Sequence, residues 1–382
     1  MENLSELLNE HLKSKNLFEK NTPWVIKCSD LNGRGLFANR DIKCGEIVFR
    51  DSPLLIGPRL NNVSEEICII CYEKRNLNFC SRNCGIRLCS KNCENTRTHQ
   101  NECRLINQWK DEQTIHKDIL KCLTPIRGLL LDNSQMNLLK CLKSHDGLQQ
   151  RPEVSIIKEK IKLTINGEEE NLLNLICSVL DTNAFEIVVG ETEETSTSSL
   201  RGIYPLSSLM NHMCIPNTTH YFDSKQNMIV KATKFIPKDQ EIFHCYTMTF
   251  WGNYIRRPYL FRTKHFICSC LRCQDPTENN TYLGAINCLK CQGYALPIFI
   301  KNLKIIWKCI QCNKIMETEK ACMIMTMLGN RFSGFETSNP DDILKFLKGV
   351  LLKYAPACSQ IAVQLKCKLM WMLGHKQSYF WG

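Results

Sequence analysis

The chain has 382 residues, 43% of them hydrophobic, so it is long enough for two or three domains and too apolar for a disordered protein. No apolar run approaches the roughly 20 residues that a membrane-spanning helix needs, and the polar N-terminus has no secretory signal. Twenty-four cysteines in such a chain indicate metal binding in a reducing compartment. We therefore expect a cytoplasmic and/or nuclear protein without a membrane partner.

The formal net charge of +11 is typical of many nucleic-acid-binding proteins. Zinc-bound cysteine is a thiolate, however, and fifteen thiolates around four Zn²⁺ ions would lower the net charge to about +4. Much of the basic excess would then balance metal sites. We expect that nucleic acid is not the main partner.

The N-terminal part of the chain combines a helix with short strands. Leucines recur there at helical spacing: Leu4, Leu7, Leu8 and Leu12. Residues 24–56 are typical of short strands around the tight turn Asn-Gly-Arg-Gly at 32–35. We expect one N-terminal helix followed by a strand-rich segment.

The segment after these strands contains eight possible metal ligands in four close pairs. They are Cys68, Cys71, Cys80, Cys84, Cys89, Cys93, His99 and Cys103. Tetrahedral Zn²⁺ takes four ligands, so eight predict two closed structural sites. A short segment with few large apolar residues cannot build a core, and metal binding would supply its folding energy. The alternative is a scatter of buried thiols.

Helical and strand-like segments alternate in the middle of the chain. Residues 106–180 have apolar residues at helical spacing, and residues 203–246 are typical of strands and turns. The acidic, hydroxyl-rich stretch 191–199 between them is expected to be a solvated linker. From residue 317 onward, helical spacing returns and predicts a helical tail.

Two further cysteine clusters precede that tail. Cys268, Cys270 and Cys273 supply three ligands, and either Cys214 or Cys245 could be the fourth. The second cluster has the spacing of a four-cysteine zinc site. Its members are Cys288, Cys291, Cys309 and Cys312. Together with the first segment, these clusters predict about four zinc ions. We expect most of the nine remaining cysteines to be small buried hydrophobes.

The order of these motifs is specific. Gly-Arg-Gly-Leu-Phe-Ala at 33–38 precedes the eight-ligand cluster, and Tyr-Pro-Leu-Ser-Ser-Leu-Met-Asn-His-Met-Cys-Ile-Pro-Asn at 204–217 follows it. Residues 232–246 and the Cys-x-Cys-x2-Cys run come next. This order resembles the SET-and-MYND-domain (SMYD) family of protein lysine methyltransferases. Asp-Pro-Thr-Glu at 275–278 and the four-cysteine ribbon resemble its arthropod, SmydA-like branch.

The resemblance implies an α+β fold, in which a β-rich SET core carries an inserted MYND zinc module. It implies these segments: an N-terminal helix (1–23), the N-terminal part of SET (24–67), MYND (68–103), a helical insert with the acidic loop (104–200), the C-terminal SET core (201–267), a post-SET zinc site (268–280), a zinc ribbon (281–316) and a short helical C-terminal region (317–382).

The resemblance also implies that the protein binds S-adenosylmethionine and methylates a lysine of a histone or non-histone protein. Its cofactor contacts would be Gly33, Arg34, Gly35, Asn211, His212, Tyr246 and Phe266. Asn183, Phe185 and Lys264 would line the lysine channel. Tyr246 would be the catalytic tyrosine, and Cys214 the fourth ligand of the post-SET zinc. Taken alone, Asn211-His212 could be an ordinary turn and Tyr246 a core aromatic.

The sequence departs from the family at several positions. Three residues separate Cys80 from Cys84 where two are usual, Met213 replaces a serine, and Lys264 replaces a channel tyrosine. Three alternatives follow for Lys264 in such a channel. Its amine would be neutral because its pKa is lowered, its amine would point outward into solvent, or its charge would block the channel and inactivate the protein. The runner-up interpretation is a non-catalytic adaptor or corepressor that regulates transcription, in which the MYND module binds a peptide. We expect a monomer in either case.

Overall fold

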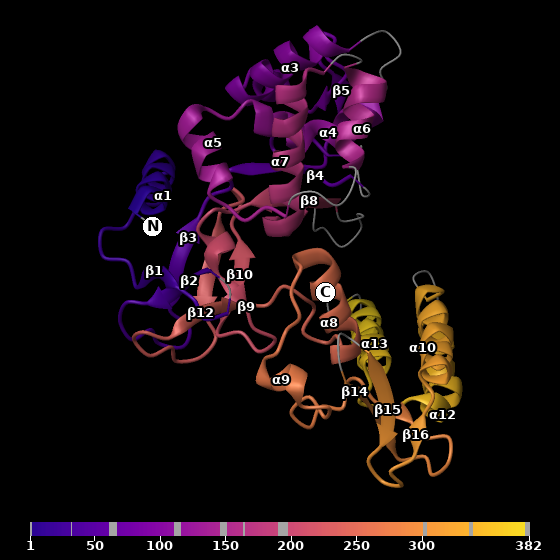
Figure 1. The fold of residues 1–382 in the computed structure, drawn as a ribbon. Coiled ribbons are helices and arrows are strands. Elements are labelled where there is room, and N and C mark those ends of the chain that lie inside the picture. The colour runs from indigo at the N-terminus through magenta and orange to yellow at the C-terminus, as the bar shows by residue number, and fades with distance from the viewer. Residues whose placement is uncertain are drawn as a thin grey trace. The chain divides into compact units, whose positions relative to one another are not determined.

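The computed structural model describes residues 2–31, 33–60, 67–110, 116–145, 151–162, 165–189, 198–300, 304–335 and 339–378 (Figure 1). The chain folds into two units. The first comprises Met1–Asn211 and Pro216–His244, and the second comprises His212–Ile215 and Cys245–Gly382. Each unit has its own hydrophobic cores. Among the helices of the described residues, none has the length and apolarity to span a bilayer.

The expected N-terminal helix is α1 (Glu2–Ser14). Leu4, Leu8 and Leu12 are buried on one face of α1, and the helix packs against α5 (Asn133–Lys140). The buried imidazole of His11 is hydrogen-bonded to the Ser52 carbonyl oxygen at 2.9 Å. The leucine spacing therefore predicted the buried face of this helix.

The first sheet of unit 1 is built on a hairpin. Strands β1 (Trp24–Cys28) and β2 (Arg34–Ala38) pair antiparallel, and Gly33 makes the turn with a φ of +62°. Strand β2 also pairs with β12 (Glu241–His244). The strand order is β1-β2-β12-β9, where β9 is Asn211–His212. This order brings residues about 200 positions apart in sequence into register, which no local pattern predicts.

Two more antiparallel sheets complete the strand-rich part of unit 1. One has the order β10-β11-β3, with β10 (Thr218–Phe222), β11 (Met228–Ala232) and β3 (Ile47–Asp51). The other has the order β4-β8-β7, with β4 (Leu55–Pro58), β8 (Ser198–Ile203) and β7 (Phe185–Val189). In β7, Ile187 and Val189 are buried, whereas the alternating residues Glu186 and Val188 are exposed, as expected for a strand that is buried on one face. A short 3-10 turn, η2 (Ser207–Leu209), precedes β9.

The rest of unit 1 is mainly helical, with one short strand pair. The segment of the eight metal ligands contains β5 (Asn78–Phe79), β6 (Arg87–Leu88), α2 (Lys91–Glu94) and α3 (Arg97–Trp109). The helical insert contains α4 (His116–Leu129), α5, α6 (Pro152–Ile156), the π-helical turn η1 (Ile157–Ile161) and α7 (Gly167–Asn183). Helix α4 packs on β4 and α7 packs on β8 (Figure 1). Residues 191–197 of the acidic stretch lie outside the described residues.

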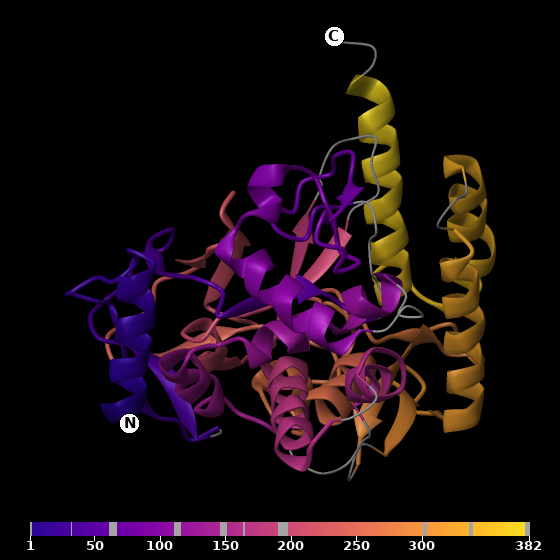
Figure 2. The ribbon, with the colours of Figure 1, turned by 90° about the horizontal axis from the view of Figure 1, so that it is seen from above.

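Unit 2 combines one four-stranded sheet with helices. It begins with α8 (Asn253–Lys264) and α9 (Leu271–Gln274). The sheet has the order β13-β14-β15-β16, with β13 (Ile286–Asn287), β14 (Tyr294–Phe299), β15 (Ile305–Cys309) and β16 (Ile315–Met316). The tail is α10 (Thr318–Ser333), α11 (Pro340–Phe346), the π-helical turn η3 (Leu347–Leu351), α12 (Leu352–Tyr354) and α13 (Gln360–Ser378). Helices α10 and α13 run side by side (Figure 2).

The α+β class and the helical tail are confirmed, whereas the finer segment boundaries stay predictions. The expectation for the nine remaining cysteines is wrong. Only Cys122 and Cys177 are buried. Three are partly exposed, namely Cys141, Cys245 and Cys358, and four are exposed, namely Cys28, Cys44, Cys322 and Cys367. Composition gives no information on which face of an element a cysteine occupies, and these residues lie on outward faces or in turns.

Candidate functional site

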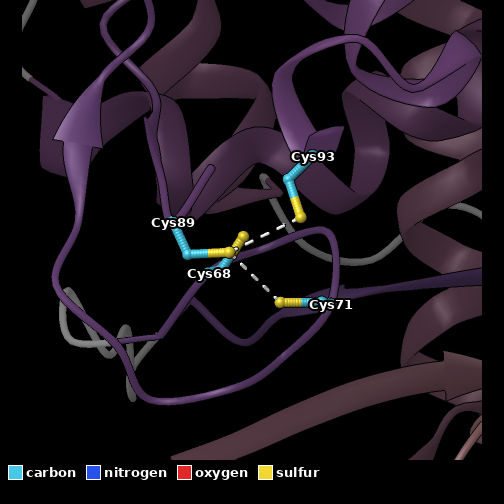
Figure 3. A group of neighbouring side chains, drawn as sticks. All are labelled: Cys68, Cys71, Cys89 and Cys93. Atoms are coloured by element: carbon cyan, nitrogen blue, oxygen red, sulfur yellow. Dashed lines mark hydrogen bonds between the residues drawn. The ribbon is translucent and has the colours of Figure 1, made fainter. Parts of the chain in front are cut away.

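The first group of ligands is Cys68, Cys71, Cys89 and Cys93, whose sulfur atoms all lie within 4.8 Å of one another. Figure 3 shows the four side chains converging from two loops and from α2. Cys89 Sγ lies 3.6 Å from Cys71 Sγ and 3.5 Å from Cys93 Sγ. Ser90 caps α2 by accepting a hydrogen bond from the Cys93 backbone N–H, which fixes the start of the helix that carries Cys93.

The second group is Cys80, Cys84, His99 and Cys103, and all four are buried. His99 Nε2 lies 3.3 Å from Cys80 Sγ. The extra residue between the first two cysteines is accommodated at Asn83, which adopts a φ of +60° and donates its backbone N–H to the Cys80 carbonyl oxygen. Asparagine tolerates this left-handed conformation. The unusual spacing therefore leaves the four donor atoms together.

The third group resolves the choice between Cys214 and Cys245. Cys214 Sγ lies 3.8 Å from Cys268 Sγ and 3.4 Å from Cys273 Sγ, and Cys270 completes the group. Cys245 instead donates its thiol to the Thr247 carbonyl oxygen at 3.2 Å. All members of this group belong to unit 2. Cys214 is thus the fourth donor.

The fourth group forms the predicted ribbon. Cys288, Cys291, Cys309 and Cys312 lie at two turns of the sheet in unit 2, and their sulfur atoms also lie within 4.8 Å of one another. Each turn contains a left-handed residue, Gln292 in one and Asn313 in the other. Three sulfur-only groups and one group with three sulfurs and one nitrogen match the donor sets of structural zinc sites. The four groups therefore fit the four ions that the sequence predicts.

Part of the expected cofactor region lies at the start of strand β2 in unit 1. The side-chain amide of Asn211 donates to the Arg34 carbonyl oxygen at 3.0 Å and to Glu241 Oε1 at 2.7 Å. A Cβ atom on Gly35 would lie 2.3 Å from Glu241 Oε1, so only glycine allows this close approach. Among the described residues other than Gly33 and its chain neighbours, no heavy atom lies within 4 Å of a Cβ built on Gly33. An open backbone beside fixed polar groups fits the binding of S-adenosylmethionine.

Arg34 and Asn183 have partners within unit 1. The Arg34 guanidinium donates to the Cys141 carbonyl oxygen at 2.5 Å. The Asn183 amide donates to the carbonyl oxygens of Lys143 and Val179. Both side chains therefore anchor the helical insert in this structure, and their expected roles at the cofactor and the lysine channel stay predictions.

Another part of the expected site is an aromatic group in unit 2. The His212 ring centroid lies 5.2 Å from that of Tyr246 and 5.8 Å from that of Phe266. His212 Nδ1 accepts the Tyr246 backbone N–H at 3.0 Å, so the proton of the neutral ring is on Nε2, 3.2 Å from Cys214 Sγ. Burial lowers the pKa of His212 to about 4, and the ring is therefore neutral at physiological pH.

Phe185 belongs to a cluster of rings in unit 1, in which Tyr204 is fully buried and the rings of Phe185, His220 and His244 are half-buried. Its centroid lies 5.7 Å from that of His220, 5.4 Å from that of His244 and 6.0 Å from that of Tyr204. The two histidine rings lie 4.9 Å apart. Burial lowers the pKa of His220, which favours the uncharged ring. Such a surface is compatible with the alkyl chain and ammonium group of a lysine.

Sequence reasoning missed Glu241 and the two histidines His220 and His244. Glu241 lies beside Asn211 only because β12 pairs with β2, and the histidines meet Phe185 only in the folded strands. A carboxylate or imidazole in a strand has no distinctive spacing, so the sequence contains no local signal for either role.

The chain is similar to several known proteins. Residues 33–247 match the SET domain family. The chain is 30% identical to the SET domain-containing protein SmydA-8, isoform A, of Drosophila melanogaster, over 97% of this chain and 82% of that protein. It is 25% identical to human histone-lysine N-methyltransferase SMYD3, over 72% of this chain and 67% of that protein. The solved structure of Rubisco LSMT bound to AdoMet has a TM-score of 0.40 and 11% identity, over 73% of this chain and 62% of that one. The chain belongs to the SET-domain family and, within it, to the SMYD group with SmydA-like relatives.

Proposed function

We propose that this protein transfers a methyl group from S-adenosylmethionine to the side-chain amine of a lysine in a protein substrate. One observation carries the proposal: two consecutive residues of the expected motif have separate supporting roles. The Asn211 side chain donates a hydrogen bond to the Arg34 carbonyl oxygen, next to Gly35. The His212 ring accepts a hydrogen bond from the Tyr246 backbone N–H. The SET match over residues 33–247 and relatives named as histone-lysine N-methyltransferases support the same activity.

The protein must overcome the charge of the substrate amine. A free lysine has a pKa of about 10.4, so only about one in two thousand is neutral at pH 7, a cost of about 4–5 kcal/mol. An apolar channel removes water from the amine and lowers its pKa. Half-buried rings such as Phe185 and His220 would provide such a wall. S-adenosylmethionine, when bound, supplies the electrophilic methyl group.

Tyr246 is assigned to orient the amine. Its backbone is fixed by His212, and its ring packs against Phe266, with the two centroids 6.4 Å apart. A hydroxyl on a ring held in this way can accept a hydrogen bond from the amine and direct its lone pair. Fixed geometry of this kind is worth several kcal/mol in a transfer reaction.

Cofactor binding is the decisive test. S-adenosylmethionine should raise the melting temperature, since it binds only the folded protein. Asn211→Ala should abolish this shift without unfolding the chain, whereas Asn133→Ala, at an exposed helix start, should keep it. A wild-type melting curve that does not move at saturating cofactor would argue against the enzyme. Transfer of radiolabelled methyl groups to proteins of a cell lysate would then identify the substrate class.

A second candidate function is a non-catalytic adaptor. It is favoured by Lys264, a cation beside the proposed catalytic ring.

We propose that the MYND module binds a short peptide in either case, because the exposed ring of Phe79, with Arg87 4.7 Å from its centroid, offers an aromatic contact. A monomer in the cytoplasm and/or nucleus is part of the same proposal. Titration with S-adenosylmethionine separates the two functions, since a pure adaptor has no need to bind it.

A further inference from the structure

The motif at 275–278 forms a turn that buries its last residue. The Asp275 carboxylate accepts hydrogen bonds from the backbone N–H groups of Thr277 at 2.8 Å and of Asn279 at 2.7 Å. Between them, Glu278 adopts a φ of +54°. A glutamate in the left-handed region is strained and persists only where its surroundings determine it. The turn therefore fixes where the Glu278 carboxylate points.

Glu278 is fully buried between two buried arginines. Its Oε2 atom accepts hydrogen bonds from Arg256 Nη1 at 2.6 Å and from Arg272 Nε at 3.2 Å. Its Oε1 atom accepts the backbone N–H of Asn253 at 2.8 Å. Arg256 is 0% exposed and Arg272 is 6% exposed. We call Arg256, Glu278 and Arg272 the buried triad. Its charges are almost completely removed from water, so each depends on the others.

The remaining arginine donors hold the segment 246–251, which is neither helix nor strand. Arg272 Nη2 donates to the carbonyl oxygens of Thr249 at 3.1 Å and Trp251 at 3.4 Å. Arg256 Nη1 also donates to the Trp251 carbonyl oxygen. Thr249 is exposed and Trp251 is partly exposed, so these arginine donors, rather than packing in a core, hold the two carbonyls in place. The triad supplies partners that a helix or sheet would otherwise provide.

The same residues contact the third zinc group. Arg256 Nη2 lies 3.6 Å from Cys273 Sγ, and Arg272 Nη1 donates to the Cys214 carbonyl oxygen at 3.3 Å. Four thiolates around Zn²⁺ leave two negative charges, and the two buried guanidinium groups lie between these charges and the carboxylate of Glu278. The other end of the segment reaches the same group, because His212 joins Cys214 to the backbone of Tyr246.

We propose that the buried triad positions Tyr246 and couples its placement to the zinc group of Cys214, Cys268, Cys270 and Cys273. The coupling to catalysis rests on the function proposed for Tyr246. Both ends of the segment 246–251 are tied to one metal group, one through His212 and the other through the arginines. Loss of the Glu278 carboxylate removes the charged acceptor that both arginines share, which loosens both guanidinium groups and frees this segment without changing the tyrosine itself. Arg256, Arg272 and Glu278 are therefore positioning residues.

Limited proteolysis of the full chain tests the placement directly. Chymotrypsin cleaves after aromatic residues, and the segment contains Tyr246, Phe250 and Trp251. Glu278→Gln should raise the cleavage rate within 246–251 by about tenfold, because cleavage follows the population of the opened segment. Glu319→Gln, at an exposed position on α10, should leave that rate unchanged. Equal rates in the two variants would overturn the proposal.

The link to catalysis needs a second measurement. Glu278→Gln should lower kcat while the melting shift with S-adenosylmethionine persists. In a Tyr246→Phe background, the same change should lower kcat no further, because both act through one hydroxyl. Multiplicative losses would show that Glu278 acts elsewhere and would overturn the coupling.

A second variant and a readout independent of methyl transfer complete the test of the buried triad. If Glu278→Gln fails to fold, Arg272→Lys retains the charge but offers fewer directed donors, and it should still raise cleavage within 246–251. A folded Arg272→Lys variant with wild-type cleavage would contradict the proposal. Proteolysis does not require methyl transfer. A wild-type protein that neither binds S-adenosylmethionine nor methylates would thus refute the proposed function, while the cleavage rates would still decide the role of the triad.

Discussion

The ammonium nitrogen of Lys264 lies 5.8 Å from the centroid of the Tyr246 ring. Lys264 is half-buried in the last turn of α8, and both residues belong to unit 2. This distance is within the range of a cation–π contact. A cation next to the proposed catalytic tyrosine also faces two other charges during turnover, those of the sulfonium and of the incoming lysine. The size of its effect on the reaction therefore depends on how close those charges come.

Lys264→Met removes the cation and keeps an apolar side chain of similar length. If the ammonium stays on the ring face and away from the substrate, methyl transfer should remain within a few-fold of wild type. At ~6 Å and an effective dielectric constant of ~20, a like-charge contact would cost roughly 3 kcal/mol, about a hundredfold in rate. Initial rates with a labelled cofactor measure the difference, and Lys345→Met on α11 is the control.

Lys264→Tyr tests the remaining interpretation, in which the charge of Lys264 inhibits methyl transfer. A hundredfold gain from near zero would identify the native lysine as an inhibitory charge. The adaptor function would then be the better account of the natural protein.

Tyr246→Phe keeps the ring and its contacts with His212 and Phe266 but removes the hydroxyl. If that hydroxyl orients the amine, kcat should fall sharply, while the melting shift with S-adenosylmethionine stays near that of wild type. Tyr221→Phe removes an exposed hydroxyl from β10 and should leave both quantities unchanged. Equal turnover in the three proteins would identify Tyr246 as a packing residue only.

The metal ligands could be predicted because their signal is local. Pairs such as Cys288 and Cys291 are placed by one turn, so two-residue spacing determines their geometry whatever the rest of the chain does. The fourth ligand of the post-SET group is the exception. Cys214 lies 54 residues before Cys268 in the sequence, and only the family resemblance preferred it to Cys245.

The charged surroundings of the site could not be predicted. Asn211 meets the Arg34 carbonyl oxygen across 177 positions of sequence, and Glu241 joins them only because β12 pairs with β2. The Asp-Pro-Thr-Glu motif resembles one in the SmydA-like branch, but its sequence does not reveal that Glu278 is buried between two arginines. Long-range pairing decides such contacts, and periodicity carries no information about it.

The ribbon provides a test of the zinc assignments. Purified protein should contain about four zinc equivalents, and replacing Cys288 and Cys291 with serine should remove one of them. Trp307 and Ala295 of the ribbon strands share a core with α10, α11 and α13, so this loss should destabilise the helical tail. Unit 1 has separate cores and should stay folded. Cys322→Ser, at an exposed cysteine, is the control, and two or fewer metals in wild-type protein purified without chelator would contradict the assignments.

Asp51 makes the stability of unit 1 depend on pH. It is fully buried on β3, and its carboxylate accepts hydrogen bonds from the Ser207 backbone N–H at 2.8 Å and hydroxyl at 3.0 Å. Burial raises the pKa of Asp51 to about 7, and the hydrogen bonds from Ser207 only partly oppose this. The unfolded chain releases this proton at a lower pH than the folded chain. Between about pH 4 and pH 7 the folded state therefore binds more protons, and this group lowers the stability as the pH rises.

Asp51→Asn should remove this dependence. Asparagine can accept the same two hydrogen bonds from Ser207 and has no charge to bury. The melting temperature of the variant, relative to wild type, should therefore be higher at pH 8 than at pH 5, because the wild type alone loses stability when its carboxyl group ionises. Asp30→Asn, at an exposed position, measures the background change from losing one surface charge. If the difference between Asp51→Asn and wild type is the same at both pH values, Asp51 does not titrate in this range, and the turn that precedes Asn211 is held by a permanently charged or permanently neutral group.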